Sequence, residues 1–201
     1  QMATEWGRSL LTRQVTPPAR LAWGVLLATI PVGLAGITLK GFIEVHLRSP
    51  LLIAVGLIAF GLLLGWADWR RRGELDVYSL SWMGMLLIGC AQALALFPGT
   101  SRSGITITAA LLLGLSREAA ARFSFLLSIP VIFLAGGLQL LDLIRSADPT
   151  DWNAILFGIL LSAFSAFVCI HYFMAFIRRI GMQPFVVYRI VLGVILIAVF
   201  W

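Results

Sequence analysis

The chain has little charge of either sign, and this scarcity excludes most classes of soluble protein. Of its 201 residues only 12% are charged, whereas 60% are hydrophobic. Average soluble domains carry about 25% charged and about 45–50% apolar residues. A soluble domain of this length could not bury so much apolar surface, so the expected solvent is a lipid bilayer. A soluble helical bundle is the alternative, but its helices rarely contain uncharged runs of about 19 residues.

Cysteine, histidine and acidic residues are also scarce. The two cysteines, Cys90 and Cys169, lie inside apolar segments and do not show the spacing of a disulfide framework or a metal site. Nine acidic residues stand against 15 basic ones, which gives a net charge of +6. Because the arginines cluster at the ends of apolar segments, membrane topology and anionic lipid explain them better than nucleic acid does. We therefore expect membrane lipids as partners, and no nucleic acid.

Long uncharged runs predict an all-α integral membrane protein with about five transmembrane helices. At 1.5 Å per residue, a run of about 19 residues is enough to cross the hydrocarbon core. The candidate spans are 21–39, 49–67, an apolar segment that follows residues 116–123 and ends at about Ile144, then 152–177 and 184–201.

The polar residues 1–20, which include Pro17 and Pro18, predict a connecting loop. We expect the whole chain, 1–201, to form a single membrane domain that is the C-terminal part of a longer protein.

The segment 77–116 contains a single charged residue, Arg102, which lies within the sequence FPGTSRSGIT. The apolar part before Pro98 is about 20 residues long, but the part after Ser103 has only about 13 residues, which is short for a span. Two apolar arms joined by a polar, helix-breaking tip predict a re-entrant helical hairpin over 78–115. Such a tip is tolerated at membrane depth only against protein or a polar cavity.

The distribution of arginines predicts the topology. Whether 78–115 is a hairpin or two spans, the arginine-rich ends share one side of the membrane, and the loops 40–48 and 145–151 lie opposite. The positive-inside rule places the arginine-rich side in the cytoplasm. The arginines concerned are Arg8, Arg13, Arg20, Arg70, Arg71, Arg72, Arg117, Arg122, Arg178 and Arg179.

The tip of the predicted hairpin has the composition of an anion site. Arg102 offers a planar, charged fork suited to phosphate or carboxylate, and nearby hydroxyls can donate to the same oxygens. A helix that begins near Ser103 adds free N–H groups and a positive dipole end. The alternative is a polar turn whose serines only cap the second arm, but a buried intramembrane arginine indicates function by default. The candidate residues are Ser101, Arg102, Ser103 and Thr106, with Gly99 and Gly104 allowing close approach of the backbone.

Two polar residues outside the tip are further candidates for substrate contact. Arg189 lies inside an apolar segment, where snorkelling to the interface and a second phosphate contact carry equal weight. Gln92 could line a polar cavity or bond to a neighbouring helix. No carboxylate lies near the tip in sequence, although phosphoryl transfer needs an acid or base and often a metal. The chain thus contains an anion site without an evident general base.

Residues 98–106 resemble the Pro-Gly-x-Ser-Arg-Ser-Gly-x-Thr motif of the bacterial undecaprenyl-pyrophosphate phosphatases, a family associated with bacitracin resistance. Gln92, the stretch 114–130 and the stretch 184–189 are similar to the same family, so the resemblance covers nearly the whole chain. It implies an enzyme of the bacterial cytoplasmic membrane that removes one phosphate from undecaprenyl pyrophosphate and recycles this lipid carrier for peptidoglycan. It also implies an inverted-repeat architecture with two re-entrant hairpins, of which this chain would hold about half.

The resemblance departs from the family pattern at the beginning of the chain. The family's earlier motif, two glutamates four residues apart followed by Ser-Ser-Thr-Gly-His, does not occur here. The resemblance therefore implies that a divalent cation, Mg²⁺ or Ca²⁺, takes its ligands mainly outside this chain, and that the chain is the C-terminal two-thirds of the enzyme. The family's phosphate-binding residues are similar to Ser101, Arg102, Ser103, Thr106 and Arg189.

Two other functions stay open at this point. An inverted-repeat transporter or flippase for lipids or anions would use the same hairpin as its anion site. A non-catalytic membrane subunit that only binds lipid headgroups is the third hypothesis. A homodimer is the oligomeric state that we carry as an expectation.

Overall fold

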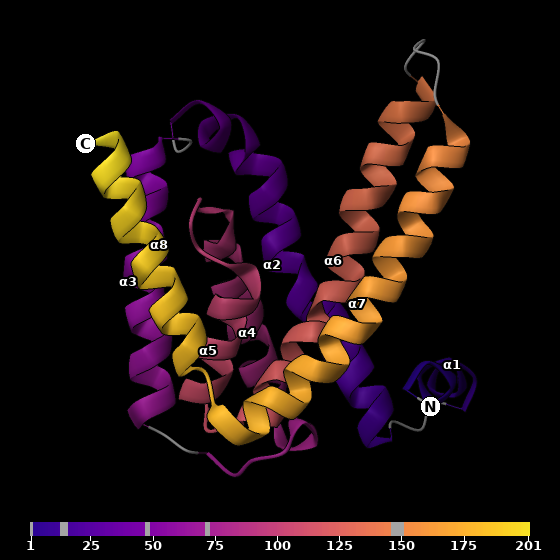
Figure 1. Ribbon diagram of the computed structural model, residues 1–201. Coiled ribbons are helices and arrows are strands. Elements are labelled where there is room, and N and C mark those ends of the chain that lie inside the picture. The colour runs from indigo at the N-terminus through magenta and orange to yellow at the C-terminus, as the bar shows by residue number, and fades with distance from the viewer. Residues whose placement is uncertain (1, 13–15, 47–48, 71–72, 146–150) are drawn as a thin grey trace.

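The structure is a computed structural model that describes residues 2–12, 16–46, 49–70, 73–145 and 151–201. Within these ranges the regular elements are helices, and the only β contact is an isolated bridge between Leu75 and Leu115. Five of the described helices are long and apolar enough to cross a membrane (Figure 1). They are α2 (Pro17–His46), α3 (Pro50–Arg70), α6 (Arg117–Arg145), α7 (Trp152–Ile180) and α8 (Gln183–Phe200). The predicted all-α integral membrane protein with five spans is confirmed.

Between α3 and α6 the chain forms a helical hairpin. Its arms are α4 (Trp82–Ala93) and α5 (Arg102–Leu112), with 3-10 turns at Val77–Ser79 and Leu94–Leu96. The arms have 12 and 11 helical residues. Both are well short of the roughly 20 residues that a span requires. The first arm, expected to be about 20 residues long, is shorter because a 3-10 turn at each end takes up part of the apolar run.

The two ends of the hairpin meet at its base. The backbone N–H of Leu75 donates to the carbonyl of Gly114 at 3.3 Å, and the N–H of Ser116 donates to the carbonyl of Leu75 at 3.0 Å. The chain therefore leaves the hairpin at the end of the bundle where it entered, and the tip points inward between α2, α3 and α8 (Figure 1). This is the geometry expected of a hairpin at 78–115 rather than of two spans.

Small residues seat the hairpin against its neighbours. A Cβ atom placed on Gly56 of α3 would lie 2.6 Å from the carbonyl oxygen of Pro98, and one on Gly99 would collide with the carbonyl oxygen of Ile53. Gly99 also has φ of +86°, a left-handed conformation that glycine adopts without strain. The tip of the hairpin is thus held directly against the backbone of α3.

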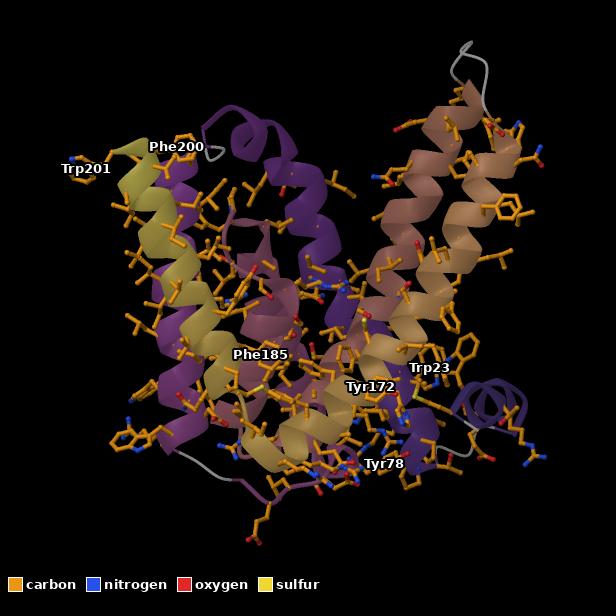
Figure 2. The ribbon with its side chains drawn as sticks, viewed as in Figure 1. Trp23, Tyr78, Tyr172, Phe185, Phe200 and Trp201 are labelled. Atoms are coloured by element: carbon orange, nitrogen blue, oxygen red, sulfur yellow. The ribbon has the colours of Figure 1, made fainter. Side chains whose placement is uncertain are left out.

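The arginine-bearing ends lie together at the hairpin's base, as the predicted topology requires. Arg20 donates through Nη2 to the carbonyls of Tyr78 and Leu80, at 2.6 and 2.9 Å. Arg178 pairs with Glu118 at 2.5 Å. Tyr78 lies at the same end of the molecule (Figure 2). Arg13, Arg71 and Arg72 fall outside the described residues.

The described residues within 1–20 are mostly helical rather than the predicted connecting loop. They contain helix α1 (Met2–Thr12) and the first turn of α2, which Pro17 begins. Proline is favoured at the first helical position because its missing N–H needs no partner there. Trp23 points from α2 toward α1 (Figure 2), its ring 5.7 Å from that of Trp6, and its Nε1 donates to Ser9 Oγ at 3.2 Å. Helix α2 also runs through His46, so the predicted loop 40–48 is largely helical; residues 146–150 of the other predicted loop lie outside the described residues.

The buried core lies around the hairpin. Met85 and Ile88 of α4, Leu111 of α5, and Phe123 and Leu127 of α6 are almost fully buried. The second half of α6 and most of α7 instead present exposed apolar side chains and stand apart from the other helices (Figure 1). Such faces are normal for helices whose solvent is hydrocarbon.

Candidate anion-binding site

The candidate site begins at the first turn of α5. The Oγ of Ser101 accepts a hydrogen bond from the N–H of Gly104 at 3.2 Å, which caps the helix. The hydroxyls of Ser101 and Ser103 lie 3.2 Å apart. Ser101 therefore caps the second arm, as the alternative to an anion site predicted. Capping does not prevent the two hydroxyls from also binding an anion, because they lie together at the positive end of the helix dipole.

Arg102 is the first residue of α5 and is half-buried. It forms no ion pair with any residue of the described ranges. A guanidinium cannot lose its charge at neutral pH, so an arginine at membrane depth calls for a negatively charged or polar partner. The position at a helix N-terminus makes that partner an anion.

Arg189 of α8 reaches the same turn of α5. A Cβ atom placed on Gly104 would lie 3.0 Å from Arg189 Nη2, 3.1 Å from Nη1 and 3.2 Å from Cζ. The residue is only 7% exposed, and its Nη1 has no hydrogen-bond partner among the described residues. Arg189 therefore does not snorkel to an interface. Its guanidinium lies over Gly104, where the absence of a side chain gives it room.

Two arginines from distant parts of the chain thus meet at the first turn of α5, one as its first residue and one through its guanidinium. Arg102 begins the first turn of α5, and Arg189 covers that turn from α8. Gly61 of α3 helps to place the second one, because a Cβ atom there would lie 3.3 Å from Arg189 Cβ. Two positive charges without acidic partners among the described residues favour a ligand with more than one negative charge.

Thr106 forms hydrogen bonds both within α5 and to α6, which its sequence position does not indicate. Its Oγ1 donates within α5 to the carbonyl of Arg102 at 2.9 Å or of Ser103 at 3.1 Å, and it lies 2.7 Å from Ser124 Oγ of α6. Thr106 and Ser124 are both buried. The pair ties the first turn of α5 to α6, so Ser124 is a residue of the site that the sequence did not single out. Its signal was weak: a serine in an apolar segment, which must find a partner when buried.

Two further buried polar groups lie on the hairpin. Gln92 is in the last helical turns of α4, and its Nε2 has no hydrogen-bond partner among the described residues. The same holds for the Oγ1 of Thr100, at the tip. An unsatisfied buried polar group costs about 1–3 kcal/mol, so such groups mark places where water or a ligand is expected. No hydrogen bond joins the Gln92 amide nitrogen to the tip, and its contact with a substrate stays a prediction.

The described residues do not suit a metal ion on their own. They include no group of three or more histidine, cysteine, aspartate or glutamate side chains that could hold one. Divalent magnesium and calcium require oxygen ligands, mostly carboxylates. The site at α5 offers hydroxyls and two guanidinium groups, which repel a cation.

Comparisons with known proteins agree over the whole chain. The family model described as "Bacitracin resistance protein BacA" matches residues 1–195. Undecaprenyl-diphosphatase 2 of Stutzerimonas stutzeri is 56% identical over 202 residues, which cover 99% of this chain and 75% of that protein. The undecaprenyl-diphosphatases of Nitrosococcus oceani and Thioalkalivibrio sulfidiphilus are 56% and 52% identical, and the matches cover all of this chain and 76% of each protein.

Proposed function

This chain belongs to the bacitracin resistance protein BacA family, and from that premise we propose that it hydrolyses undecaprenyl pyrophosphate to undecaprenyl phosphate and inorganic phosphate. The reaction recycles the lipid carrier for cell-wall synthesis. The observation that carries the proposal at the level of the site is that α5 begins with Arg102, while the Arg189 guanidinium of α8 lies over Gly104 in the same turn. A pyrophosphate has two phosphate groups, and this site has two guanidinium groups without acidic partners among the described residues.

The residues of this chain bind and neutralise the pyrophosphate. Arg102 and Arg189 hold phosphoryl oxygens with charge-assisted hydrogen bonds. The hydroxyls of Ser101 and Ser103 and the N–H groups of the first turn of α5 donate to the same oxygens. The space beside Gly104 is taken by the Arg189 guanidinium, and Gly99 lies against the backbone of α3, so the predicted approach of ligand to these two glycines is replaced by packing contacts. Thr106 fixes the turn against Ser124.

In the net reaction the oxygen of water bonds to the terminal phosphorus, and the bond from that phosphorus to the bridging oxygen breaks. The leaving undecaprenyl phosphate takes the electron pair of that bond, and negative charge grows on the phosphoryl oxygens. Each donor aimed at such charge contributes about 3–4 kcal/mol to lowering the barrier. The proton of the water goes to a base that is not among the residues of the site described here.

The substrate explains the depth of the site. The polyprenyl tail stays in the bilayer while the pyrophosphate meets the polar hairpin tip inside the protein, where non-helical backbone is tolerated. We place the protein in the bacterial cytoplasmic membrane, with its arginine-rich end in the cytoplasm. A divalent cation, Mg²⁺ or Ca²⁺, belongs to the proposal with carboxylate ligands outside this chain, where it would neutralise charge on the phosphates. A homodimer is the oligomeric state we propose, which light scattering of the purified protein tests.

The experiment is phosphate release by the purified native protein in detergent. We expect inorganic phosphate from undecaprenyl pyrophosphate, and much less from undecaprenyl phosphate, which lacks the second charged group. An absence of release, together with counterflow of a labelled anion in liposomes, would replace hydrolysis with the transporter hypothesis.

A further inference from the structure

A polar cavity lies away from the hairpin tip, at the arginine-rich end of the bundle. It has a volume of about 670 Å³ and opens between the end of α3, the end of α7 and the start of α8. Its lining includes Trp66, Asp68, Trp69, Arg117, Arg179 and Gln183. Nothing in the proposed hydrolysis uses these residues.

The floor of the cavity is a fixed ion pair. Asp68 is 1% exposed, and Arg117 of α6 donates to both of its carboxylate oxygens, from Nε at 2.5 Å and from Nη2 at 2.9 Å. The N–H of Met182 lies 3.4 Å from Asp68 Oδ2. Gly181 has φ of +81°, and a Cβ atom there would lie 2.8 Å from Arg117 Cζ. The charge of Asp68 is therefore already balanced by Arg117, and it cannot neutralise a second cation.

The wall of the cavity carries positive charge that is not balanced. Arg179 is exposed and forms no ion pair with a residue of the described ranges, whereas its neighbour Arg178 pairs with Glu118. Arg70, at the end of α3, lies over the ring of Trp66 at 5.0 Å from the centroid. Its charge therefore also lies beside the cavity.

The same cavity has an apolar rim at the end of a membrane span. Trp66 is 42% exposed and Trp69 is 81% exposed, and both belong to the last turns of α3. Tryptophan at a span end is typical of the membrane–water interface, where its ring lies at the level of lipid headgroups. The cavity thus combines a positive wall with aromatic side chains at one membrane surface.

We propose that this cavity binds the phosphate headgroup of an anionic glycerophospholipid from the leaflet at the arginine-rich end. Arg179 contacts the phosphate. Gln183, at the start of α8, donates through Nε2 to Asp68 Oδ2 at 3.5 Å and offers its second amide N–H to the ligand. Trp66 and Trp69 pack beside the glycerol and the first carbons of the acyl chains. A lipid fits the cavity better than free phosphate does, because free phosphate has no apolar part that could pack against the exposed tryptophans. The anionic surface of the cytoplasmic leaflet attracts basic residues in general. The cavity would add a specific contact with one lipid headgroup to this general attraction. The inference stands independently of the hydrolysis.

The test is native mass spectrometry of the purified protein titrated with phosphatidylglycerol, with phosphatidylcholine in parallel. For the first bound phosphatidylglycerol we expect Arg179→Gln to raise the dissociation constant about tenfold, as loss of one charge-assisted contact would. The matched control is Arg178→Gln, which removes the same charge one residue away but outside this cavity, and should change it by less than about twofold. Trp69→Ala, which changes no charge, should also weaken binding.

Three results would overturn the proposal. One is an equal loss of affinity in Arg178→Gln and Arg179→Gln, because it would indicate general attraction by charge. Another is unchanged affinity in Arg179→Gln. The third is displacement of the first lipid by millimolar inorganic phosphate, because the ligand would then be a free anion. Thermal unfolding of each variant checks the fold, and we expect midpoints close to that of the unchanged protein because the substituted side chains are exposed.

Discussion

At the residue scale, the site depends on which way two arginines point. The sequence identified Arg102 because an arginine between helix-breaking residues in an apolar run has few structural explanations. It could not decide the role of Arg189, since the orientation of that side chain is set by how α8 packs on α3 and α5. The contact over Gly104 decides the orientation. The sequence alone does not explain why a glycine stands in the first turn of α5. The structure explains it by the side chain of Arg189, 85 positions away, which occupies the space beside Gly104.

Gly104→Ala should displace the Arg189 guanidinium with little cost to the fold. The new methyl would lie 3.0–3.2 Å from three atoms of that guanidinium, and the backbone of α5 accepts alanine. We expect kcat/KM for undecaprenyl pyrophosphate to fall at least about tenfold, as loss of one charged contact would produce. Gly136→Ala in α6 is the control, since a Cβ there meets nothing within 4 Å. Equal activities in the two variants would remove Arg189 from the site.

At the element scale, the hairpin was predictable and its seating was not. The short second arm and the polar tip indicate that the chain turns back inside the membrane, because backbone polar groups there must be satisfied by protein. The contact of Gly99 with the carbonyl of Ile53 could not be predicted, since it joins residues 46 apart through a close backbone approach. Helix α1 was missed for the same kind of reason. Its formation rests on packing of Trp6 against Trp23 rather than on a continuous apolar run.

Gly99→Ala should unseat the hairpin tip. Alanine at φ of +86° costs about 1–2 kcal/mol from the backbone alone, and its methyl would also collide with the carbonyl of Ile53. We expect the free energy of unfolding in detergent to fall by about 2 kcal/mol or more, with a loss of phosphate release. Gly33→Ala, whose methyl meets nothing within 4 Å, should unfold at or above the wild-type temperature. A Gly99→Ala protein as stable as Gly33→Ala would contradict the seating described for the tip.

Asp68→Asn tests how the helix ends are held together. The buried carboxylate joins α3 to Arg117 of α6 and to the start of α8. Removing one partner of a fully buried pair costs about 3–5 kcal/mol, because the other charge remains without compensation. The Arg117 side chain is 30% exposed, so water compensates part of its charge and the expected cost lies below that range. We expect a clear fall in the thermal midpoint. Glu118→Gln breaks the exposed pair with Arg178 and should cost less than about 1 kcal/mol. Similar midpoints for the two variants would mean that the Asp68 pair does not hold these helices.

At the scale of the whole molecule, composition and periodicity were enough to predict the class and the spans. An uncharged run of about 19 residues has few uses other than crossing a bilayer, so the five spans could be read from segment lengths. The shared position of the arginine-bearing ends followed from the positive-inside rule. What the sequence could not supply is which helix faces meet, because that depends on side-chain packing between distant segments. The inverted-repeat relation to a second hairpin stays a prediction, and with it the source of the general base.

The most direct measurement of the central claim is the rate of phosphate release from undecaprenyl pyrophosphate by Arg102→Gln, set against Arg178→Gln. Loss of one donor to developing phosphoryl charge lowers the rate about 10²–10³-fold, and we expect this for Arg102→Gln in a protein that folds normally. Arg178→Gln removes the same charge from the arginine-rich end, where it pairs with Glu118, and should keep near wild-type activity. A near wild-type rate for Arg102→Gln would contradict the claim that the pyrophosphate is held at the first turn of α5.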